Sequence, residues 1–346
     1  MDRTRFGIIG CGAAAVPVCE AIHNSEAAEI VVACDVDQEL ARDIGERFGI
    51  GVTAEVDAVL SHPEVDAVYI AVPHDLLAPF ARQALEAGKH ALVEKPMALT
   101  LQDADDLINL AEVRGLALGV FYELRYATPF VHARQLVRAG AIGRVIGVRI
   151  QTLIDKPAEY WQTGYTGRSV SPWRGQKARA GGGVLLMNTS HLLDAVRYIT
   201  GLEVASVSAE IGTLVAVVEV EDTAAATLLY GNGAIGSLFA GVHLAGAAEA
   251  ERCEIYGTEG QLLAPDPYAG GDLRVFLRRA WQDIPGGAWH SLSWPPADVY
   301  SCAVADFARA VQQGAPAPID GRDARRVLAI VLAMYQSAQE RQTVSL

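Results

Sequence analysis

The fold of this chain is decided near its amino terminus, where residues 6–15 read FGIIGCGAAA. The apolar run from Phe6 to Ile9 is typical of a buried parallel strand. It leads into Gly10-Cys11-Gly12-Ala13-Ala14-Ala15, a G-x-G-x-x-A pattern that opens an amphipathic helix. The first glycine permits a tight turn, the second lets the backbone approach a pyrophosphate, and the small last residue allows close helix–strand packing. The stretch therefore predicts a dinucleotide-binding turn.

An acidic residue follows at the spacing that such a turn requires. Asp35 ends the second apolar run, EIVVACD, and stands twenty residues after Ala15. Its carboxylate can accept hydrogen bonds from the adenosine ribose hydroxyls, and its charge would repel a 2′-phosphate, which predicts NAD rather than NADP. The alternative is a glycine-rich turn in which Asp35 caps the following helix. The predicted cofactor residues of this region are Ile9, Gly10, Gly12, Ala13, Ala14 and Asp35.

Strand and helix patterns alternate through the first third of the chain. Apolar strand patterns occupy residues 29–35, 66–73, 90–96 and 116–122, with helical patterns between them. This order implies a parallel sheet with helices on both faces, which binds ligands at the carboxyl ends of its strands. The further residues predicted to contact the cofactor at that edge are Ala71, Pro73, His74, Glu94 and Lys95.

Lys95 is the strongest catalytic candidate at this edge. A lysine is usually a solvated surface group. Here it follows an apolar strand and precedes Pro96, which prevents the strand from continuing. Its position on the ligand-binding edge therefore favours a functional role.

The composition indicates a globular protein with more than one domain. The chain has 346 residues, which are too many for one ordinary core. Of these residues 51% are apolar and 20% are charged, as in a globular protein. The net charge of −13 disfavours a nucleic-acid partner, because phosphate groups need a basic face. No apolar run reaches the roughly 18 residues of a membrane helix. No signal peptide fits the first residues, so we expect no membrane association.

The five cysteines predict neither a disulfide framework nor a metal site. They form no CxxC pair and no cluster with histidines, so we expect them to behave as small buried hydrophobes. An odd, scattered set is typical of a reducing compartment, which predicts a cytoplasmic location. They stand at Cys11, Cys19, Cys34, Cys253 and Cys302.

The second half of the chain reads as a large sheet. Alternating or apolar runs near residues 144–152, 204–213, 222–232, 234–243 and 252–264 are broken by glycine and asparagine. Amphipathic helical patterns follow at 301–314 and 321–340. A broad sheet face without helices has to be buried, which predicts a homodimer or homotetramer through that face.

A second candidate site lies in GGGVLLMNTSHLLDAVRYITG, residues 181–201. Three glycines precede a helical pattern that carries Asn188, His191 and Asp194. A single histidine in this position is often a structural one, bonded to a backbone carbonyl. Asp194 shares a helix face with His191 and could contact substrate, or be an ordinary exposed aspartate in the first turn.

Taken together, GIIGCGAAA, ACD, EKP and the GGG…H..D segment resemble the Gfo/Idh/MocA family of oxidoreductases. EAGKHALVEKPMALT at 86–100 and WRG at 173–175 fit the same family. The resemblance implies a Rossmann domain at residues 1–123 and an α/β domain with a large, mostly antiparallel, open-faced sheet at 124–346. It also implies NAD(P) and a substrate that is a sugar or a cyclitol.

The resemblance further implies that the EKP lysine and the histidine of the GGG segment meet at the substrate carbinol. Lys95 would then polarise the oxygen as a compact cation, and His191 would accept or return the proton. We expect His191 to start a helix whose amino end faces the substrate. Family members commonly carry an acidic residue four positions before this histidine, where this chain has Met187. Either the assisting carboxylate is missing, or Met187 fills a core position that the chemistry does not need.

Further candidates follow the last Rossmann strand and fill the polar, aromatic segment before the glycines. Ring faces and guanidinium groups suit sugar rings and carboxylates, and a long loop in a compact domain is often functional. The basic cluster of Arg168, Arg174, Lys177 and Arg179 suggests an anionic substrate such as a sugar acid, or simply balances the acidic chain. The family places a Trp-Arg pair near the nicotinamide, which implies Trp173 and Arg174 as cofactor residues. The predicted substrate residues are Arg125, Tyr126, Trp161, Tyr165, Arg168, Asn188, His191 and Asp194.

The leading hypothesis is an NAD(P)-dependent oxidoreductase that transfers a hydride between nicotinamide and a hydroxyl or keto carbon of a sugar, sugar acid or cyclitol. Two alternatives stay open. One is glycoside cleavage assisted by transient oxidation of the sugar, without net turnover of NAD. The other is a regulator that binds a dinucleotide without catalysis.

Overall fold

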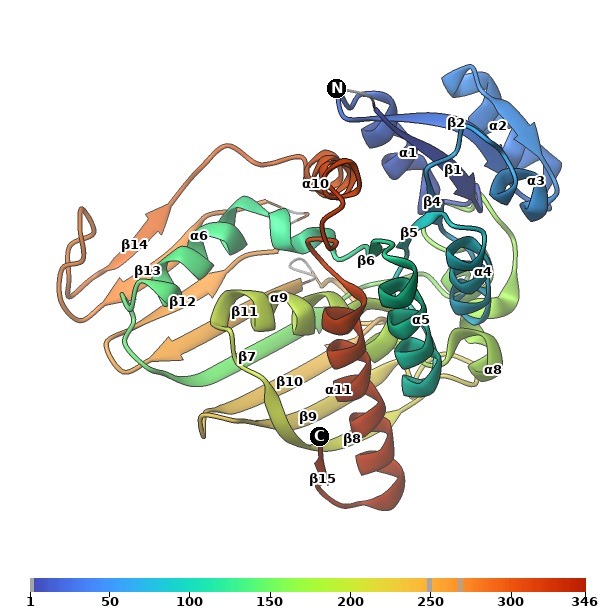
Figure 1. The fold of residues 1–346 in the computed structure, drawn as a ribbon. Helices are drawn as coiled ribbons and strands as arrows, with labels where there is room; N and C mark the ends of the chain where they lie inside the picture. Colours follow the sequence, from blue (N-terminus) through green and yellow to red (C-terminus); the bar gives the residue numbers. More distant parts are fainter. Residues whose placement is uncertain (1–2, 248–250, 267, 269) are drawn as a thin grey trace. The chain divides into compact units, whose positions relative to one another are not determined.

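The computed structural model describes residues 3–247, 251–266, 268 and 270–346, which form two compact units (Figure 1). The first unit contains residues 1–123, 159–181 and 299–328. The second contains residues 124–158, 182–298 and 329–346. Within the described ranges, every helix is too short or too polar to cross a membrane.

The first unit is built on the predicted parallel sheet, which is confirmed. Its strand order is β3-β2-β1-β4-β5-β6, and each neighbouring pair is parallel. Side chains of the central strands, such as Ile8, Val68 and Ile70, are completely buried because helices cover both faces. The strands are β1 (Thr4–Ile9), β2 (Ala28–Cys34), β3 (Gly51–Thr53), β4 (Ala67–Ile70), β5 (His90–Val93) and β6 (Leu118–Val120).

The helices of this unit alternate with its strands as predicted. The sequence did not predict β3 and the helix after it. The short β3 and the helix after it have only three and five residues, too few to show a clear apolar period. The helices that lie between these strands in the sequence are α1 (Ala15–His23), α2 (Gln38–Phe48), α3 (Val56–Leu60), α4 (His74–Glu86) and α5 (Leu101–Arg114). Residues 159–181 add α7 (Tyr160–Thr163) and α8 (Lys177–Ala180).

The helix α10 (Val299–Gln313) also belongs to the first unit, far from it in sequence. Its Phe307 ring lies 6.1 Å from the ring of Phe6 in β1. The Thr4 hydroxyl donates to the Ala308 carbonyl at 3.0 Å. This helix therefore completes the core of the parallel sheet, and α11 (Gly321–Glu340) runs from the first unit into the second.

The second unit contains the expected large sheet. Its strand order is β14-β13-β12-β11-β7-β10-β9-β8-β15, and all described pairs are antiparallel except β10 with β7. The strands are β7 (Val145–Leu153), β8 (Val204–Gly212), β9 (Thr223–Tyr230), β10 (Ile235–Gly241), β11 (Glu251–Gly257), β12 (Gly260–Ala264), β13 (Leu273–Leu277), β14 (Trp289–Leu292) and β15 (Val344–Ser345). The mostly antiparallel, mixed sheet predicted for this half is confirmed.

The two faces of this sheet differ in exposure. The helices α6 (Thr128–Arg138) and α9 (Ser190–Thr200) lie on one face, over buried residues of the strands (Figure 1). Along the strands, exposed residues alternate with these buried ones. Among the exposed residues are Leu229, Ile235 and Phe239, which are 45%, 62% and 41% exposed. The sheet therefore presents apolar side chains on its other face, as expected for an open-faced sheet.

Candidate functional site

The glycine-rich turn after β1 has the geometry that its sequence predicts. Gly10 has a φ of 93°, and a Cβ there would lie 2.3 Å from the carbonyl oxygen of Ala71, so only glycine fits. A Cβ on Gly12 would meet nothing within 4 Å. Gly12 is therefore not required by the packing of this chain. Its open side leaves room for the close approach of a pyrophosphate, at the start of α1 where backbone N–H groups lack helical partners.

Asp35 is attached to this turn rather than to the next helix. Its Oδ2 accepts the N–H of Cys11 at 2.7 Å, and its Oδ1 accepts the N–H of Asp37 at 2.8 Å. The cap of α2 is Asp37, whose side chain accepts the N–H of Glu39. The alternative that Asp35 caps the helix is therefore wrong. A carboxylate held in this way fits the ribose-binding role, and the residues present fit a dinucleotide.

Lys95 follows β5 at the same edge of the sheet and is half-buried beside an acid. The neighbouring Glu94 accepts the hydroxyl of Tyr69 at 2.6 Å. Burial raises the pKa of Glu94, while the positive charge of Lys95 acts to lower it. Because β4 pairs with both β1 and β5, Lys95 lies at the edge that also carries the Gly10 turn.

His74 begins α4 at this edge and is neutral. Burial, assisted by the charge of Lys95, lowers the pKa of His74 to about 3. Its Nδ1 lies 2.8 Å from the carbonyl oxygen of Ala180, so Nδ1 carries the proton and Nε2 is the acceptor. Its ring meets that of Trp173 edge-on at 4.7 Å. The structure therefore brings together two of the predicted cofactor residues.

The aromatic segment, residues 159–181, is a packed part of the first unit. Arg174 lies over the rings of Trp173 at 4.7 Å and Tyr160 at 5.8 Å. Trp161 is 4% exposed and packs against Tyr160, whereas Tyr165 is 66% exposed. Trp161, predicted to contact substrate, is therefore largely enclosed by protein, while Tyr165 presents its ring to solvent.

Arg168, another predicted substrate residue, lies against the glycine-rich turn. Its Nε donates to the carbonyl oxygen of Cys11 at 3.0 Å, and its Nη1 lies 2.6 Å from the carboxylate of Asp43 in α2. In the same segment Arg179 pairs with Asp75 at 3.1 Å. Two members of the basic cluster are thus neutralised by acids of the first unit, which weakens the case for an anionic substrate.

Gly182 and Gly183 of the second candidate site leave room for buried neighbours. A Cβ on Gly182 would lie 1.9 Å from the Tyr335 hydroxyl, and one on Gly183 would lie 1.8 Å from the Glu221 carbonyl oxygen. The Glu221 carboxylate accepts the N–H groups of Gly183 and Leu185 at 2.8 and 3.0 Å, and the hydroxyl of Tyr335 at 2.9 Å. A buried glutamate therefore caps the amino end of the helical segment.

This cap corrects the expected place of His191. The helical backbone begins at Val184, runs through a π-helical turn (Leu185–Thr189) and continues as α9. His191 is the second residue of α9 but lies well inside the continuous helical segment. The prediction that its helix starts there is wrong, because the helical segment already begins at Val184, where Glu221 caps it. That its amino end faces the substrate stays a prediction. A π-helical turn of this kind is frequent at functional sites.

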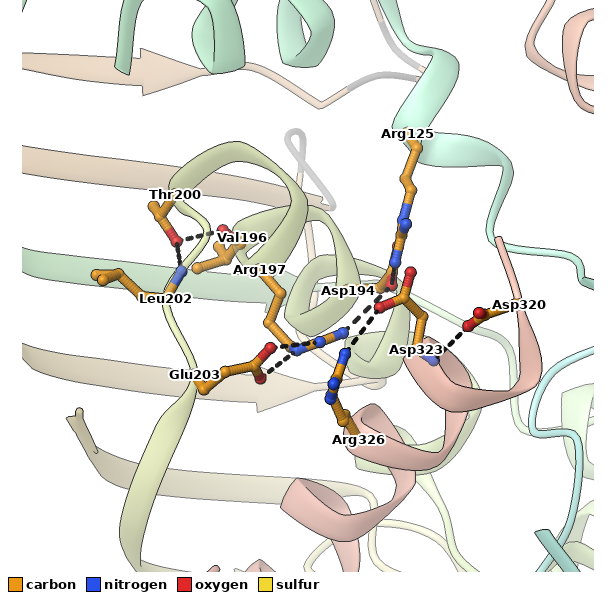
Figure 2. A network of polar contacts seen from close by, with 10 residues as sticks. All are labelled: Arg125, Asp194, Val196, Arg197, Thr200, Leu202, Glu203, Asp320, Asp323 and Arg326. Atoms are coloured by element: carbon orange, nitrogen blue, oxygen red, sulfur yellow. Dashed lines mark hydrogen bonds and ion pairs between the residues drawn. The ribbon is translucent and has the colours of Figure 1, made fainter. Parts of the chain in front are cut away.

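Asp194 and Arg125, both predicted to contact substrate, pair with each other (Figure 2). The Arg125 guanidinium donates to the two carboxylate oxygens of Asp194 at 2.7 and 2.5 Å. The Asp194 side chain is 1% exposed, so the alternative of an exposed first-turn aspartate is wrong. Further along α9, Arg197 makes a second two-pronged pair with Glu203 (Figure 2). These pairs anchor α9 within the second unit.

The structure adds Lys156, which the sequence analysis did not select. It follows β7, is 4% exposed, and donates from Nζ to the Oδ1 of Asn188 at 2.9 Å. An ammonium group has no acceptor, so the amide oxygen of Asn188 faces Lys156 and the amide NH₂ points away from it. The signal was present: DKP at 155–157 repeats the strand-lysine-proline pattern of EKP at 94–96.

Met187 and Tyr126 complete the predicted positions. Met187 is 5% exposed inside the π-helical turn, which fits the interpretation that it fills the core. Tyr126 ends a 3₁₀ turn (Glu123–Tyr126) and is half-buried. Lys95 belongs to the first unit and His191 to the second, so their meeting at a substrate stays a prediction.

All five cysteines are free thiols. Cys11, Cys19, Cys34 and Cys253 are buried as predicted, while Cys302 is partly exposed. Burial raises the pKa of the Cys34 thiol to about 11. The described residues contain no group of three or more His, Cys, Asp or Glu side chains that could hold a metal ion.

Two family models match the chain. Residues 4–122 match an oxidoreductase family with an NAD-binding Rossmann fold. Residues 130–263 match the Gfo/Idh/MocA C-terminal domain. The two matches correspond to the parallel sheet and to most of the nine-stranded sheet.

Known relatives resemble the chain over nearly its full length. The 1,5-anhydro-D-fructose reductase of Ensifer adhaerens is 28% identical, with 96% of each chain covered. The myo-inositol 2-dehydrogenase of Thermotoga maritima is 25% identical, covering 99% of this chain and 98% of the relative. Among solved structures, levoglucosan dehydrogenase in complex with NADH has a TM-score of 0.87 at 27% identity, with 99% of each chain covered.

Proposed function

Since this chain belongs to the Gfo/Idh/MocA family of NAD-binding oxidoreductases, we propose that it transfers a hydride between NAD and a hydroxyl or keto carbon of a sugar or cyclitol. One observation carries the proposal. The Gly10 turn, the fixed carboxylate of Asp35 and the ammonium of Lys95 all follow strands at the same carboxyl edge of the parallel sheet. That arrangement combines a dinucleotide cradle with a cation suited to a reacting oxygen.

Two residues of the protein handle the charge and the proton of the reaction. Lys95 stabilises the oxygen of the reacting carbinol as negative charge develops on it. His191 accepts the hydroxyl proton during oxidation and returns it during reduction. When bound, NAD supplies the hydride acceptor or donor. His74 stays neutral, because its pKa of about 3 lies far below working pH.

We propose a neutral substrate rather than a sugar acid. Arg168 and Arg179 already pair with acids of this chain. The relatives named above act, by their names, on an anhydrofructose, an inositol and levoglucosan, which carry no carboxylate. Asn188, with its amide NH₂ turned away from Lys156, would donate hydrogen bonds to a substrate hydroxyl or carbonyl oxygen. Arg125 and Asp194 would support the site through α9.

The experiment is a screen of neutral sugars, inositols and sugar acids for NADH formation, with the reverse reaction followed as NADH consumption. We expect turnover with a neutral polyol and NAD, and little with NADP. Release of an aglycone without NADH would favour redox-assisted glycoside cleavage. NAD binding without reaction across the panel would favour a non-catalytic regulator.

We also propose that the chain forms a homodimer or homotetramer through the exposed sheet face and works in the reducing cytoplasm. Leu229, Ile235 and Phe239 are apolar and exposed on that face, and the five cysteines are free thiols. Light scattering on wild type and on Phe239→Asp tests the interface. We expect the variant to have a smaller mass, and an unchanged mass would argue against this face.

A further inference from the structure

The carboxylate of Glu94 is held at both of its oxygens. Glu94 directly follows β5 and precedes Lys95. Its Oε1 accepts the hydroxyl of Tyr69 at 2.6 Å, and its Oε2 accepts the backbone N–H of Lys95 at 3.3 Å. A side chain whose two oxygens are both hydrogen-bonded has little freedom to change its rotamer. The carboxylate therefore has a defined position at the carboxyl edge of the parallel sheet.

The Tyr69 hydroxyl that holds this carboxylate is itself fixed by packing. Tyr69 belongs to β4, the strand next to β5, and is completely buried. Its ring meets that of Phe121 edge-on at 5.8 Å, and Phe121 stacks on Tyr300 of α10 at 5.8 Å. Burial and the charge of Glu94 raise the pKa of Tyr69 well above its ordinary value. The hydroxyl therefore keeps its proton and is a permanent donor to Glu94.

The negative charge of Glu94 opposes folding. Burial raises the pKa of Glu94, because a carboxylate is poorly solvated in this position. A glutamine would accept the same hydrogen bond from Tyr69 without carrying a charge. The positive charge of Lys95 and the two donated hydrogen bonds act in the opposite direction and favour the ionised carboxylate. The charge is therefore balanced by Lys95, which points to a role in the state of that lysine.

The other titratable groups of this cluster are neutral near neutral pH. His74 of α4 faces Lys95, and burial lowers the pKa of His74 to about 3. Cys19 of α1 and Tyr300 of α10 face Tyr69. Burial raises the pKa of Cys19 to about 12. Of these groups, Glu94 supplies the negative charge that acts on Lys95.

We propose that Glu94 is a positioning residue, which Tyr69 holds in place and which keeps Lys95 in the ammonium form beside the reacting oxygen. Lys95 is half-buried, and burial by itself favours a neutral amine. A neighbouring carboxylate favours the ammonium. The proposal rests on the role of Lys95 in the proposed function. Glu94 and Tyr69 transfer neither the hydride nor the proton.

The first test removes the charge of Glu94 and keeps its shape. In Glu94→Gln we expect the alkaline limb of the pH profile of kcat to move to lower pH by about one unit, because the ammonium loses its countercharge. Acetylation of Lys95 at increasing pH, followed by mass spectrometry, measures the same shift without a substrate. The internal control is Lys89, which precedes β5 and donates to two backbone carbonyls; its acetylation midpoint should not move.

The second test keeps the charge and frees the carboxylate. Tyr69→Phe removes the hydroxyl and leaves the ring against Phe121. We expect kcat to fall about fivefold, with KM and NADH affinity within about twofold of wild type, because the lysine is charged but less well placed. The Lys95 midpoint should stay within about half a unit. The matched control is Tyr256→Phe, which removes the hydroxyl that Tyr256 donates to Glu254 in the mixed sheet and should leave kcat unchanged.

Glu94→Asp is a second way to free the carboxylate. It keeps the charge on a side chain that is one methylene shorter, so we expect it to behave like Tyr69→Phe. These two variants carry the test if Glu94→Gln does not fold.

Two results overturn the proposal. The first is an unchanged Lys95 midpoint in Glu94→Gln; a large loss of NADH affinity in that variant would then identify Glu94 as a cofactor residue instead. The second is wild-type kcat in folded Tyr69→Phe and Glu94→Asp. A wild-type protein that oxidises no sugar refutes the proposed function, and the acetylation experiment still decides whether Glu94 sets the charge of Lys95.

Discussion

Two lysines in this protein follow the same local rule and reach different environments. Lys95 follows β5 in EKP, and Lys156 follows β7 in DKP. Lys95 is half-buried beside Glu94, whose carboxylate accepts the Tyr69 hydroxyl. Lys156 is 4% exposed and donates to the neutral amide of Asn188. The preceding acid differs too, because Asp155 accepts the backbone N–H of Gly246.

The difference shows that a strand-lysine-proline pattern marks a strand edge but does not assign a role. The edge of the parallel sheet joins Lys95 to a dinucleotide turn. The edge of the mixed sheet joins Lys156 to the π-helical turn that precedes His191. On this comparison we propose Lys95 as the catalytic residue, and Lys156 as a positioning residue that acts through Asn188.

The largest expected effect is on the first of these lysines. Lys95→Met should lower kcat by about 10³-fold, because the developing charge on the substrate oxygen loses its cation. NADH affinity should stay within about twofold of wild type. Steady-state kinetics with the best sugar and a fluorescence titration with NADH measure both.

A matched control lies at the other end of the same strand. Lys89, just before β5, donates to the carbonyl oxygens of His62 and Val65 at 3.1 and 2.7 Å. Lys89→Met should lower the melting temperature and leave kcat within about twofold. A Lys95 variant that loses less than about tenfold in kcat would remove Lys95 from the mechanism.

The next largest effect is expected at the amino end of the helical segment that Glu221 caps. A Cβ on Gly183 would lie 1.8 Å from the Glu221 carbonyl oxygen, so Gly183→Ala forces the capped helix end apart. We expect a loss of about 1–3 kcal/mol in the free energy of unfolding, typical of overpacking. Urea unfolding measures it. Gly231→Ala is the control, because its Cβ would make only an ordinary contact at 3.8 Å; equal stabilities would show that the helix end yields freely.

Lys156→Met should have a smaller catalytic effect than Lys95→Met. It removes a charge-assisted hydrogen bond to Asn188, and we expect kcat/KM to fall about tenfold, mostly through KM. Asn188→Asp keeps a partner for Lys156 but replaces the amide donor by an acceptor, so it should also raise KM. Should Lys156→Met instead lower kcat as far as Lys95→Met does, the division between catalytic and positioning lysine fails.

The smallest effect concerns the acid beside Lys95. Burial raises the pKa of Glu94 in the folded protein, so the native state binds more protons than the unfolded state between the ordinary and the raised value. Stability therefore falls as pH rises through that window. Glu94→Gln cannot ionise and still accepts the Tyr69 hydroxyl.

Melting temperatures measured from acid to slightly alkaline pH check this sign. The wild type should lose stability with rising pH relative to Glu94→Gln, by a difference of about 2 °C. In Lys95→Met the window should extend to higher pH, because the charge that lowers the pKa of Glu94 is gone. Parallel curves for wild type and Glu94→Gln would show that Glu94 ionises as it does in the unfolded chain.

The local sequence determined the dinucleotide half of this protein. The spacing of Gly10, Gly12 and Asp35 acts over a few residues of chain, and a strand followed by a helix leaves such a turn only one geometry. Apolar periodicity likewise predicted the parallel sheet and most of the mixed one, because burial repeats with the period of each element. Short elements such as β3 were not predicted, because three residues are too few to show a period.

The tertiary structure decided what the side chains of the site touch. Arg168 meets a turn 157 positions away, Arg125 pairs with Asp194 across 69 positions, and Gly182 and Gly183 make room for Tyr335 and Glu221. No local pattern encodes these partners, because each contact depends on how distant elements pack together. The spacing of residues in the sequence therefore determined the backbone of the Gly10–Gly12 turn. The partners of the charged side chains were determined by tertiary packing.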